Sequence, residues 1–203
     1  MLTRYLKRTS LAGRRLMRRL ASDTHGVAAV EFGYLAPIML IMLIGTAEAS
    51  RAISMDRRFG IVTAMTGDLI SREKTINDAQ LAAIMDSIEH VMRPYDTSSL
   101  KLGVIAVKAS STNANDTRVE WSYSHNSASV PSQCAAYTLP TGMLAPGASV
   151  IVVETSYEFQ PLLSGFNYGS FSFPSRTWDD KSTHSPRNSC VDYNGTNCVL
   201  TCS

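Results

Sequence analysis

The sequence predicts an α+β fold: a long N-terminal transmembrane helix that continues into a stalk, a second amphipathic helix, a small antiparallel sheet and a disulfide-tied C-terminal tail. Three patterns carry this prediction. One long apolar run lies near the N-terminus, helical spacing of apolar residues follows it, and alternation with a period of two begins at about residue 100. We therefore divide the chain into residues 1–26, 27–49, 50–93 and 94–203.

The first segment, residues 1–26, is a basic leader. It carries seven lysines and arginines against one acid, Asp23, whereas the rest of the chain has 12 basic and 16 acidic residues. The excess of positive charge thus belongs to a short leader and not to one face of a folded domain. We do not expect nucleic acid as a partner.

The second segment, residues 27–49, is an apolar run of the length that a membrane-spanning helix needs. About 20 residues rising 1.5 Å each cross a hydrocarbon core of about 30 Å. Basic residues crowd its N-terminal side, so the positive-inside rule predicts one transmembrane pass with a cytoplasmic N-terminus and an exported C-terminal region. A cleavable secretory signal, with small residues at 45–50 as its cleavage site, is an alternative that the pattern leaves open.

Glu31 interrupts the apolar run. A carboxylate inside an apolar helix costs a few kcal/mol unless it is paired or protonated. Glu31 either requires a partner within the membrane or reaches back to the cytoplasmic interface. The residues alone favour neither reading.

The residues around Glu31 resemble the start of type IV prepilins. Gly26 ends the basic leader, Val27 begins the apolar run, and Glu31 is the fifth residue after Gly26, followed by the aromatic Phe32. Together with the continuation LAPIML and a Gly-x-x-Glu-x-x-Arg segment, residues 26 to about 58 are similar to the TadE-like pseudopilins of the Flp pilus, or tight-adherence, system. That segment contains Gly45, Glu48 and Arg51.

The resemblance implies a structural role in assembly or secretion of a Flp-type pilus. A prepilin peptidase would cut after Gly26 and leave an α-amino group on Val27, and Glu31, with Phe32 beside it, would act in subunit assembly as the counter-ion of that amine. The implied location is the bacterial inner membrane, with a periplasmic C-terminal region, or a pilus. The implied partners are inner membrane lipid, the peptidase, other pilin or pseudopilin subunits and the assembly machinery.

Glu48 and Arg51 mark the outer end of the transmembrane segment. They are three residues apart, so their side chains can meet on one helix face, where an exposed ion pair contributes only tenths of a kcal/mol. We expect them to mark a boundary and not to catalyse a reaction.

Two helical patterns fill residues 50–93. In the first, apolar residues recur at spacings of three and four, which predicts an apolar face made of Ile61, Val62, Met65 and Leu69. The second begins with Thr75 and Asp78 as a capping-box-like start and ends before Pro94. Its predicted core face consists of Leu81, Ile84, Met85, Ile88 and Val91. The sequence leaves open that these faces pack against partner subunits instead.

Three strands are predicted in the C-terminal region, at residues 100–110, 117–125 and 149–159. The tail from residue 171 is rich in Ser, Asn and Cys, and no strand is predicted in it. All four cysteines lie in the exported region, which indicates disulfides of unassigned pairing. They are Cys134, Cys190, Cys198 and Cys202.

No catalytic, metal-binding or phosphate-binding motif is present, so we expect neither an enzyme nor a cofactor. Two other functions stay open at this point. One is an unprocessed single-pass protein with a membrane-anchored periplasmic binding or sensor domain. The other is an exported enzyme whose site is assembled from residues that are distant in the sequence.

Overall fold

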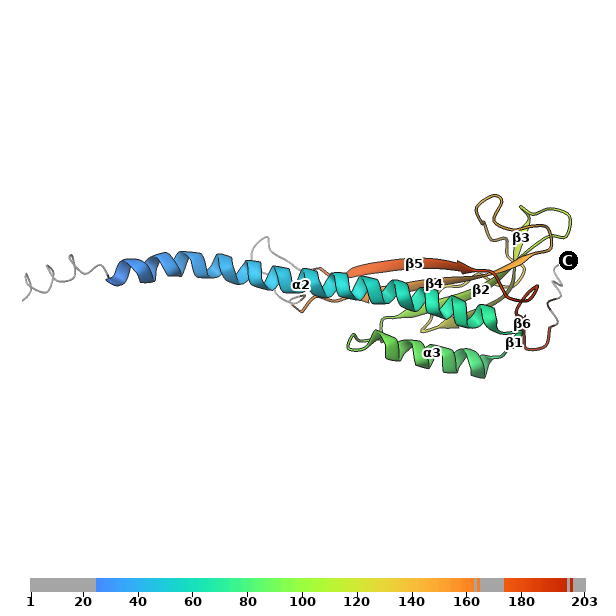
Figure 1. Cartoon of the computed structure of the whole chain (residues 1–203), viewed down its shortest axis with the longest axis horizontal. Coiled ribbons are helices and arrows are strands. Elements are labelled where there is room, and N and C mark those ends of the chain that lie inside the picture. Colours follow the sequence, from blue (N-terminus) through green and yellow to red (C-terminus); the bar gives the residue numbers. More distant parts are fainter. Residues whose placement is uncertain (1–24, 163, 165–173, 197, 199–203) are drawn as a thin grey trace, which may run out of the picture. The chain divides into compact units, whose positions relative to one another are not determined.

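The computed structural model describes residues 25–162, 164, 174–196 and 198 (Figure 1). The chain divides into two compact units, Met1–Ala49 and Ser50–Ser203, and helix α2, His25–Arg72, contributes residues to both. The predicted fold class is confirmed, because a long apolar helix, a second helix, a small antiparallel sheet and a C-terminal disulfide are all present. Residues 1–24 of the predicted leader lie outside the described residues.

In the second unit α2 packs against the sheet through a face that differs from the predicted one. Val62 is buried, but Ile61, Met65 and Leu69 are exposed, so the predicted apolar stripe is not the face that packs on the sheet. The buried face contains several hydroxyl residues that an apolar pattern does not count, and their polar groups are satisfied locally, as when Thr66 donates to the Val62 carbonyl at 2.8 Å. Its members are Met55, Phe59, Val62, Thr63, Thr66 and Ile70.

A polar seam joins α2 to the sheet. The hydroxyls of Thr63 and Thr155 are 2.7 Å apart, and Ser182 donates to the Thr63 carbonyl at 3.0 Å. One turn further along, the helix approaches the sheet so closely that a Cβ on Gly67 would lie 2.1 Å from Cδ2 of His184. Only glycine fits at this contact.

Helix α3, Asp78–Met92, starts with a capping box that lies two residues later than predicted. Asn77 accepts from the Gln80 amide at 2.9 Å, and the Gln80 side chain accepts from the Asn77 amide at 3.0 Å. Thr75, the predicted cap, lies instead in strand β1, Thr75–Ile76, which pairs in parallel with β6, Asp192–Tyr193. Of the predicted core face, Leu81, Met85 and Ile88 are buried, whereas Ile84 and Val91 are partly buried against the core. Met92, which was not predicted, is also buried.

The main sheet has four antiparallel strands in the order β3-β2-β4-β5. Three of them match the predicted strands to within a residue: β2 is Lys101–Ala109, β3 is Thr117–His125 and β4 is Ser149–Phe159. The fourth, β5, Arg176–His184, lies in the tail where no strand was predicted. Its sequence contains no aliphatic residue, in keeping with a strand in which no side chain is fully buried.

The sheet is covered on both faces. Helices α2 and α3 cover one face and form the larger core with Val104, Trp121, Ile151 and Tyr157, among others. On the other face a smaller cluster around Ile105 and Val152 is covered by the segment between β3 and β4. The covering side chains are Val130, Ala135, Tyr137, Leu139 and Leu144.

The cysteines take part in disulfides, as predicted. Cys190 and Cys198 are bonded to each other, with 6.2 Å between their Cα atoms, and Cys134 is also disulfide-bonded. Cys202 lies outside the described residues. The disulfide between Cys190 and Cys198 closes a loop within the tail, and next to it Trp121 donates its indole N–H to the Val191 carbonyl at 2.9 Å, a polar contact that fixes the tail to the sheet.

Candidate functional site

The predicted processing and assembly residues lie together at the start of α2. Gly26 is the second residue of the helix, and Val27, Glu31 and Phe32 follow within two turns, all of them exposed. Phe32 is 66% exposed. Among the described residues, Glu31 makes no hydrogen bond or ion pair, so its carboxylate is available to a group outside this chain.

The helix that carries these residues is apolar on all sides. Its most apolar stretch has a mean hydropathy of 2.1, and none of that stretch is buried within the chain. A helix that exposes large apolar side chains all round requires an apolar surrounding. The segment therefore fits a membrane anchor. Pro37 lies inside this stretch without ending the helix, as membrane helices tolerate.

Glu48 and Arg51 lie three residues apart on α2, and both make contacts. The Arg51 guanidinium lies 5.8 Å from the centre of the Phe159 ring at the end of β4, a cation–π distance. The Tyr95 hydroxyl donates to the Arg51 carbonyl at 3.4 Å. Arg51 is thus fixed to the second unit, and the role of the pair as a boundary stays a prediction.

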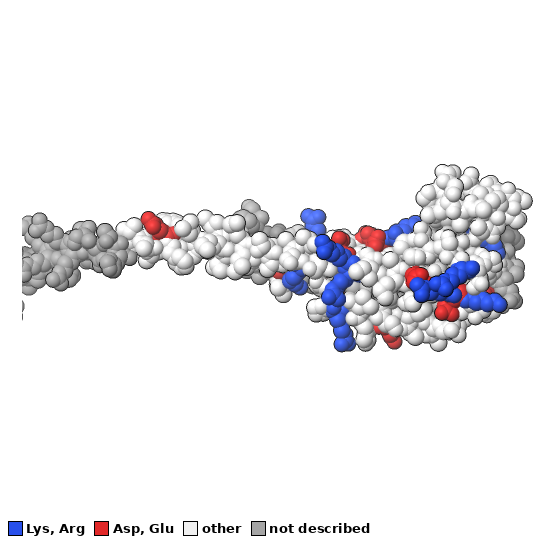
Figure 2. Space-filling view, viewed as in Figure 1, with Lys and Arg blue, Asp and Glu red and all other residues white. Residues whose placement is uncertain are grey.

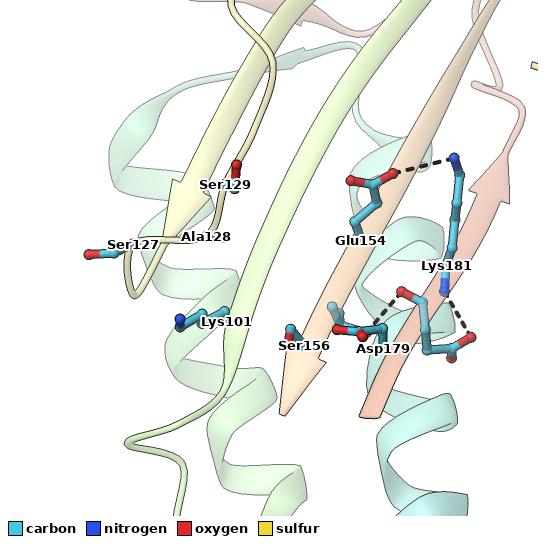
Figure 3. A pocket seen from close by; sticks show the side chains of 10 residues that line it. Lys101, Ser127, Ala128, Ser129, Glu154, Ser156, Asp179 and Lys181 are labelled. Atoms are coloured by element: carbon cyan, nitrogen blue, oxygen red, sulfur yellow. Dashed lines mark hydrogen bonds and ion pairs between the residues drawn. The ribbon is translucent and has the colours of Figure 1, made fainter. Parts of the chain in front are cut away.

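A second candidate site is a cleft on the outer face of the sheet, with a volume of about 730 Å³ (Figure 3). Strand register creates it, since Lys101, Ser156 and Asp179 are aligned across three strands. The turn after β3, with Ser127 and Ser129, forms its wall. Behind this wall a Cβ on Gly103 would lie 2.7 Å from a methyl group of Val130, so the segment packs directly on the sheet.

Part of the cleft is an internally paired cluster of charges. Lys181 lies 3.3 Å from the Glu154 carboxylate (Figure 3). Tyr137 donates its hydroxyl to Glu154 at 2.6 Å. Burial, and then the hydrogen bond to Glu154, raise the pKa of Tyr137, which stays protonated at physiological pH. These contacts hold the segment between β3 and β4 on the sheet. The cleft offers hydroxyls and charges of both signs.

A comparison with known proteins identifies the N-terminal region. Residues 26–64 match the sequence family described as TadE-like protein. This segment is TadE-like. The match begins at Gly26 and includes Glu31, Phe32, Glu48 and Arg51, so it confirms the family resemblance on which their roles were predicted. No curated protein and no solved structure matches the chain.

The TadE-like match ends within the second unit, before the sheet begins. The cleft and the sheet therefore have no counterpart among the comparisons. Within the part of the chain that the structure describes, no three side chains of the metal-binding types gather. The outer cleft was not predicted from the sequence, because its residues come from four separate segments and only the register of the strands brings them together.

A buried carboxylate in β3 was also missed. Glu120 is 4% exposed, and neither of its oxygens has a hydrogen-bond partner. Lys108 lies 4.0 Å away and donates to the Cys198 carbonyl at 2.6 Å. Burial raises the pKa of Glu120, Lys108 lowers it, and the charge of Asp192 raises it further. In the sequence Glu120 is the only acid of this strand, and nothing there marks it as buried.

Proposed function

We propose that the chain is a minor pilin or pseudopilin with a structural role in assembly or secretion of a Tad pilus. The TadE-like match over residues 26–64 is the observation that carries this proposal. The exposed apolar helix supports it, because pilin-type subunits require an anchor before assembly and a helix surface for neighbours afterwards.

The proposed mechanism begins at Gly26. The basic leader keeps the N-terminus in the cytoplasm, a prepilin peptidase cuts after Gly26, and the new amine on Val27 carries a positive charge at the edge of the membrane. Glu31 then pairs with the amine of a neighbouring subunit. Because the surroundings have a low dielectric constant, this pair is strong, and it sets the axial position of one subunit against the next.

The second unit supports a structural role through its exposed helix surface. Ile61, Met65 and Leu69 follow one another at four-residue spacing on α2, and they are 51%, 40% and 36% exposed. Ridges of this spacing pack into the grooves of another helix. We propose that the second unit is periplasmic, that it is not an enzyme, and that this ridge contacts neighbouring subunits.

The first experiment concerns processing. Mass spectrometry of the chain extracted from membranes of cells that contain the peptidase should find Val27 at the N-terminus. In cells without the peptidase the same chain should begin at Met1. An intact Met1 in both strains would contradict processing.

The second experiment concerns Glu31. The variant Glu31→Gln should insert into the membrane as before but should reduce the number of pili per cell, because the amine of the neighbour loses its counter-ion. Glu73→Gln, at an exposed carboxylate just beyond α2, is the matched control and should assemble normally. Unchanged piliation in Glu31→Gln would remove Glu31 from the mechanism.

The outer cleft favours a second candidate function, an unprocessed anchored protein that binds a ligand in the periplasm. Its volume of about 730 Å³ lies within the range of small-molecule sites. This function predicts that the chain keeps Met1 and that deletion of the gene leaves piliation intact. The processing experiment therefore separates the two candidates.

A further inference from the structure

Five arginines gather at the end of the second unit that contains Ser50. Three of them are on α2, one follows α3, and one begins β5, so elements distant in the sequence contribute to the same end. We call them the arginine belt: Arg51, Arg57, Arg58, Arg93 and Arg176. Figure 2 shows basic side chains in a band across this end of the unit.

Contacts between described residues hold the belt together. Arg58 donates to the Val91 carbonyl at 3.1 Å and to the Arg93 carbonyl at 2.8 Å, which places the end of α3 beside α2. On the other side Arg51 stacks over Phe159, and Phe159 is paired in register with Arg176. The belt therefore runs from α3 across α2 to the β4–β5 edge.

Three of the five guanidinium groups of the belt form no ion pair within the described part of the chain. Arg57, Arg93 and Arg176 are exposed and make no ion pair in the described part of the chain. Acids are also present near these arginines in the chain, Asp56, Asp96 and Glu158 among them, and they reduce the positive charge of this end. A group of arginines without partners is suited to bind anions, and guanidinium groups bind phosphate oxygens in pairs.

The short distance along the chain between the apolar segment and the belt indicates which anion the belt binds. The apolar segment ends at residue 49, and from Ser50 to Arg57 the helix advances only about 10 Å. This distance is close to the Debye length of about 8 Å at physiological ionic strength. The connection from β4 to β5 also starts and ends at this end of the sheet, and residues 160–175 contain four aromatic residues and no charged one.

We propose that the arginine belt binds the phosphate headgroups of anionic phospholipids in the membrane that anchors the chain. The lipids lie on the side of the membrane that the second unit faces, opposite the basic leader. Binding holds the second unit against the bilayer surface until the subunit leaves the membrane. The inference requires a membrane anchor, but it depends neither on cleavage after Gly26 nor on a pilus.

The experiment measures how fast each arginine side chain is modified. The full chain is placed in nanodiscs of phosphatidylcholine or of mixed phosphatidylcholine and phosphatidylglycerol, and it is treated with phenylglyoxal, an uncharged arginine reagent. Peptide mass spectrometry then gives a rate for each arginine. Arg72, the last residue of α2, and Arg187, whose amide donates to the Ser71 carbonyl at 3.0 Å, are the internal controls at the opposite end of the helix.

Phosphatidylglycerol should slow modification of Arg57, Arg93 and Arg176 by about fivefold, since each basic residue near an anionic surface contributes about 1 kcal/mol. The rates at Arg72 and Arg187 should not change. Salt at about 0.5 M should restore the rates, because it screens the attraction. Equal rates in both lipids, or equal slowing at Arg187, would overturn the proposal.

Two further arms test the identity of the partner. Soluble polyglutamate added to phosphatidylcholine nanodiscs should protect the belt less than phosphatidylglycerol does, and equal protection would favour an acidic protein over a lipid. In the variant Arg57→Gln/Arg93→Gln, protection of Arg176 should fall, whereas Arg72→Gln/Arg187→Gln should leave it unchanged. Full protection of Arg176 in the first variant would contradict binding by the belt as a group.

Discussion

The two parts of α2 differ in the exposure of their apolar side chains. Up to residue 44 the large apolar residues are exposed, as Met42 is at 65%, whereas Met55 and Ile70 in the second unit are fully buried. In the first part the apolar surface must be covered by lipid or by other subunits, whereas in the second part the chain itself covers one face and leaves the ridge of Ile61, Met65 and Leu69 exposed. Function and stability are therefore expected to depend on different parts of one helix.

The largest expected effect tests this contrast directly. Ile88→Ala removes a fully buried side chain from the core under α3 and should lower the free energy of unfolding of the second unit by about 2–5 kcal/mol. Ile41→Ala, at a residue that is 55% exposed, should leave it unchanged. Chemical unfolding of the detergent-solubilised chain, followed by tryptophan fluorescence, measures both. A comparable loss in Ile41→Ala would mean that the first part contributes to the core.

A smaller effect is expected at glycines. Gly67→Ala places a methyl group against the ring of His184 and should cost about 1–2 kcal/mol, because the end of β5 must shift. Gly45→Ala meets no atom within 4 Å and should have no such cost. If the His184 ring is the obstacle, the double variant Gly67→Ala/His184→Ala should recover most of the loss. Failure to recover would assign the cost to the backbone.

The smallest effect is a gain in stability. Glu120→Gln removes a buried charge whose oxygens have no hydrogen-bond partner, and it should raise the free energy of unfolding at neutral pH by roughly 1 kcal/mol. Because the folded state raises the pKa of Glu120, wild-type stability should fall as the pH rises above about 4.5, its ordinary value. The variant should lack this part of the pH dependence. Melting temperatures between pH 4 and pH 8 measure both expectations, and a destabilised variant would show that the Lys108 pair outweighs burial.

Sequence patterns predicted the elements that bury one continuous stripe. The three strands and the core face of α3 were found because their apolar residues repeat with the period of a strand or a helix. Strand β5 was missed because it lies at the sheet edge, where residues such as Asp179 and Lys181 keep it in water. The helical face of α2 was misplaced because Thr63 and Thr66 are buried through hydrogen bonds that no hydropathy pattern records.

The candidate sites also differ in how well the sequence predicts them, depending on whether their residues lie in one stretch of the chain. Gly26, Glu31 and Phe32 were found because they lie within one short stretch, and a stretch of sequence is what a family resemblance detects. The outer cleft and the arginine belt each require residues from several elements to meet, and pairings such as Phe159 with Arg176 depend on strand register. Such sites become visible only when the fold is known.

The polar seam between α2 and the sheet has a mechanical consequence. An interface of apolar side chains alone can slip by a fraction of a turn at little cost, but the contact between Thr63 and Thr155 and the donation from Ser182 to the Thr63 carbonyl exist at one setting of the helix only. At Gly67 the His184 ring fills the space into which a shifted side chain would move. A displacement of this part of α2 along its axis is therefore passed to the sheet as a whole, and the second unit moves with its helix as one body.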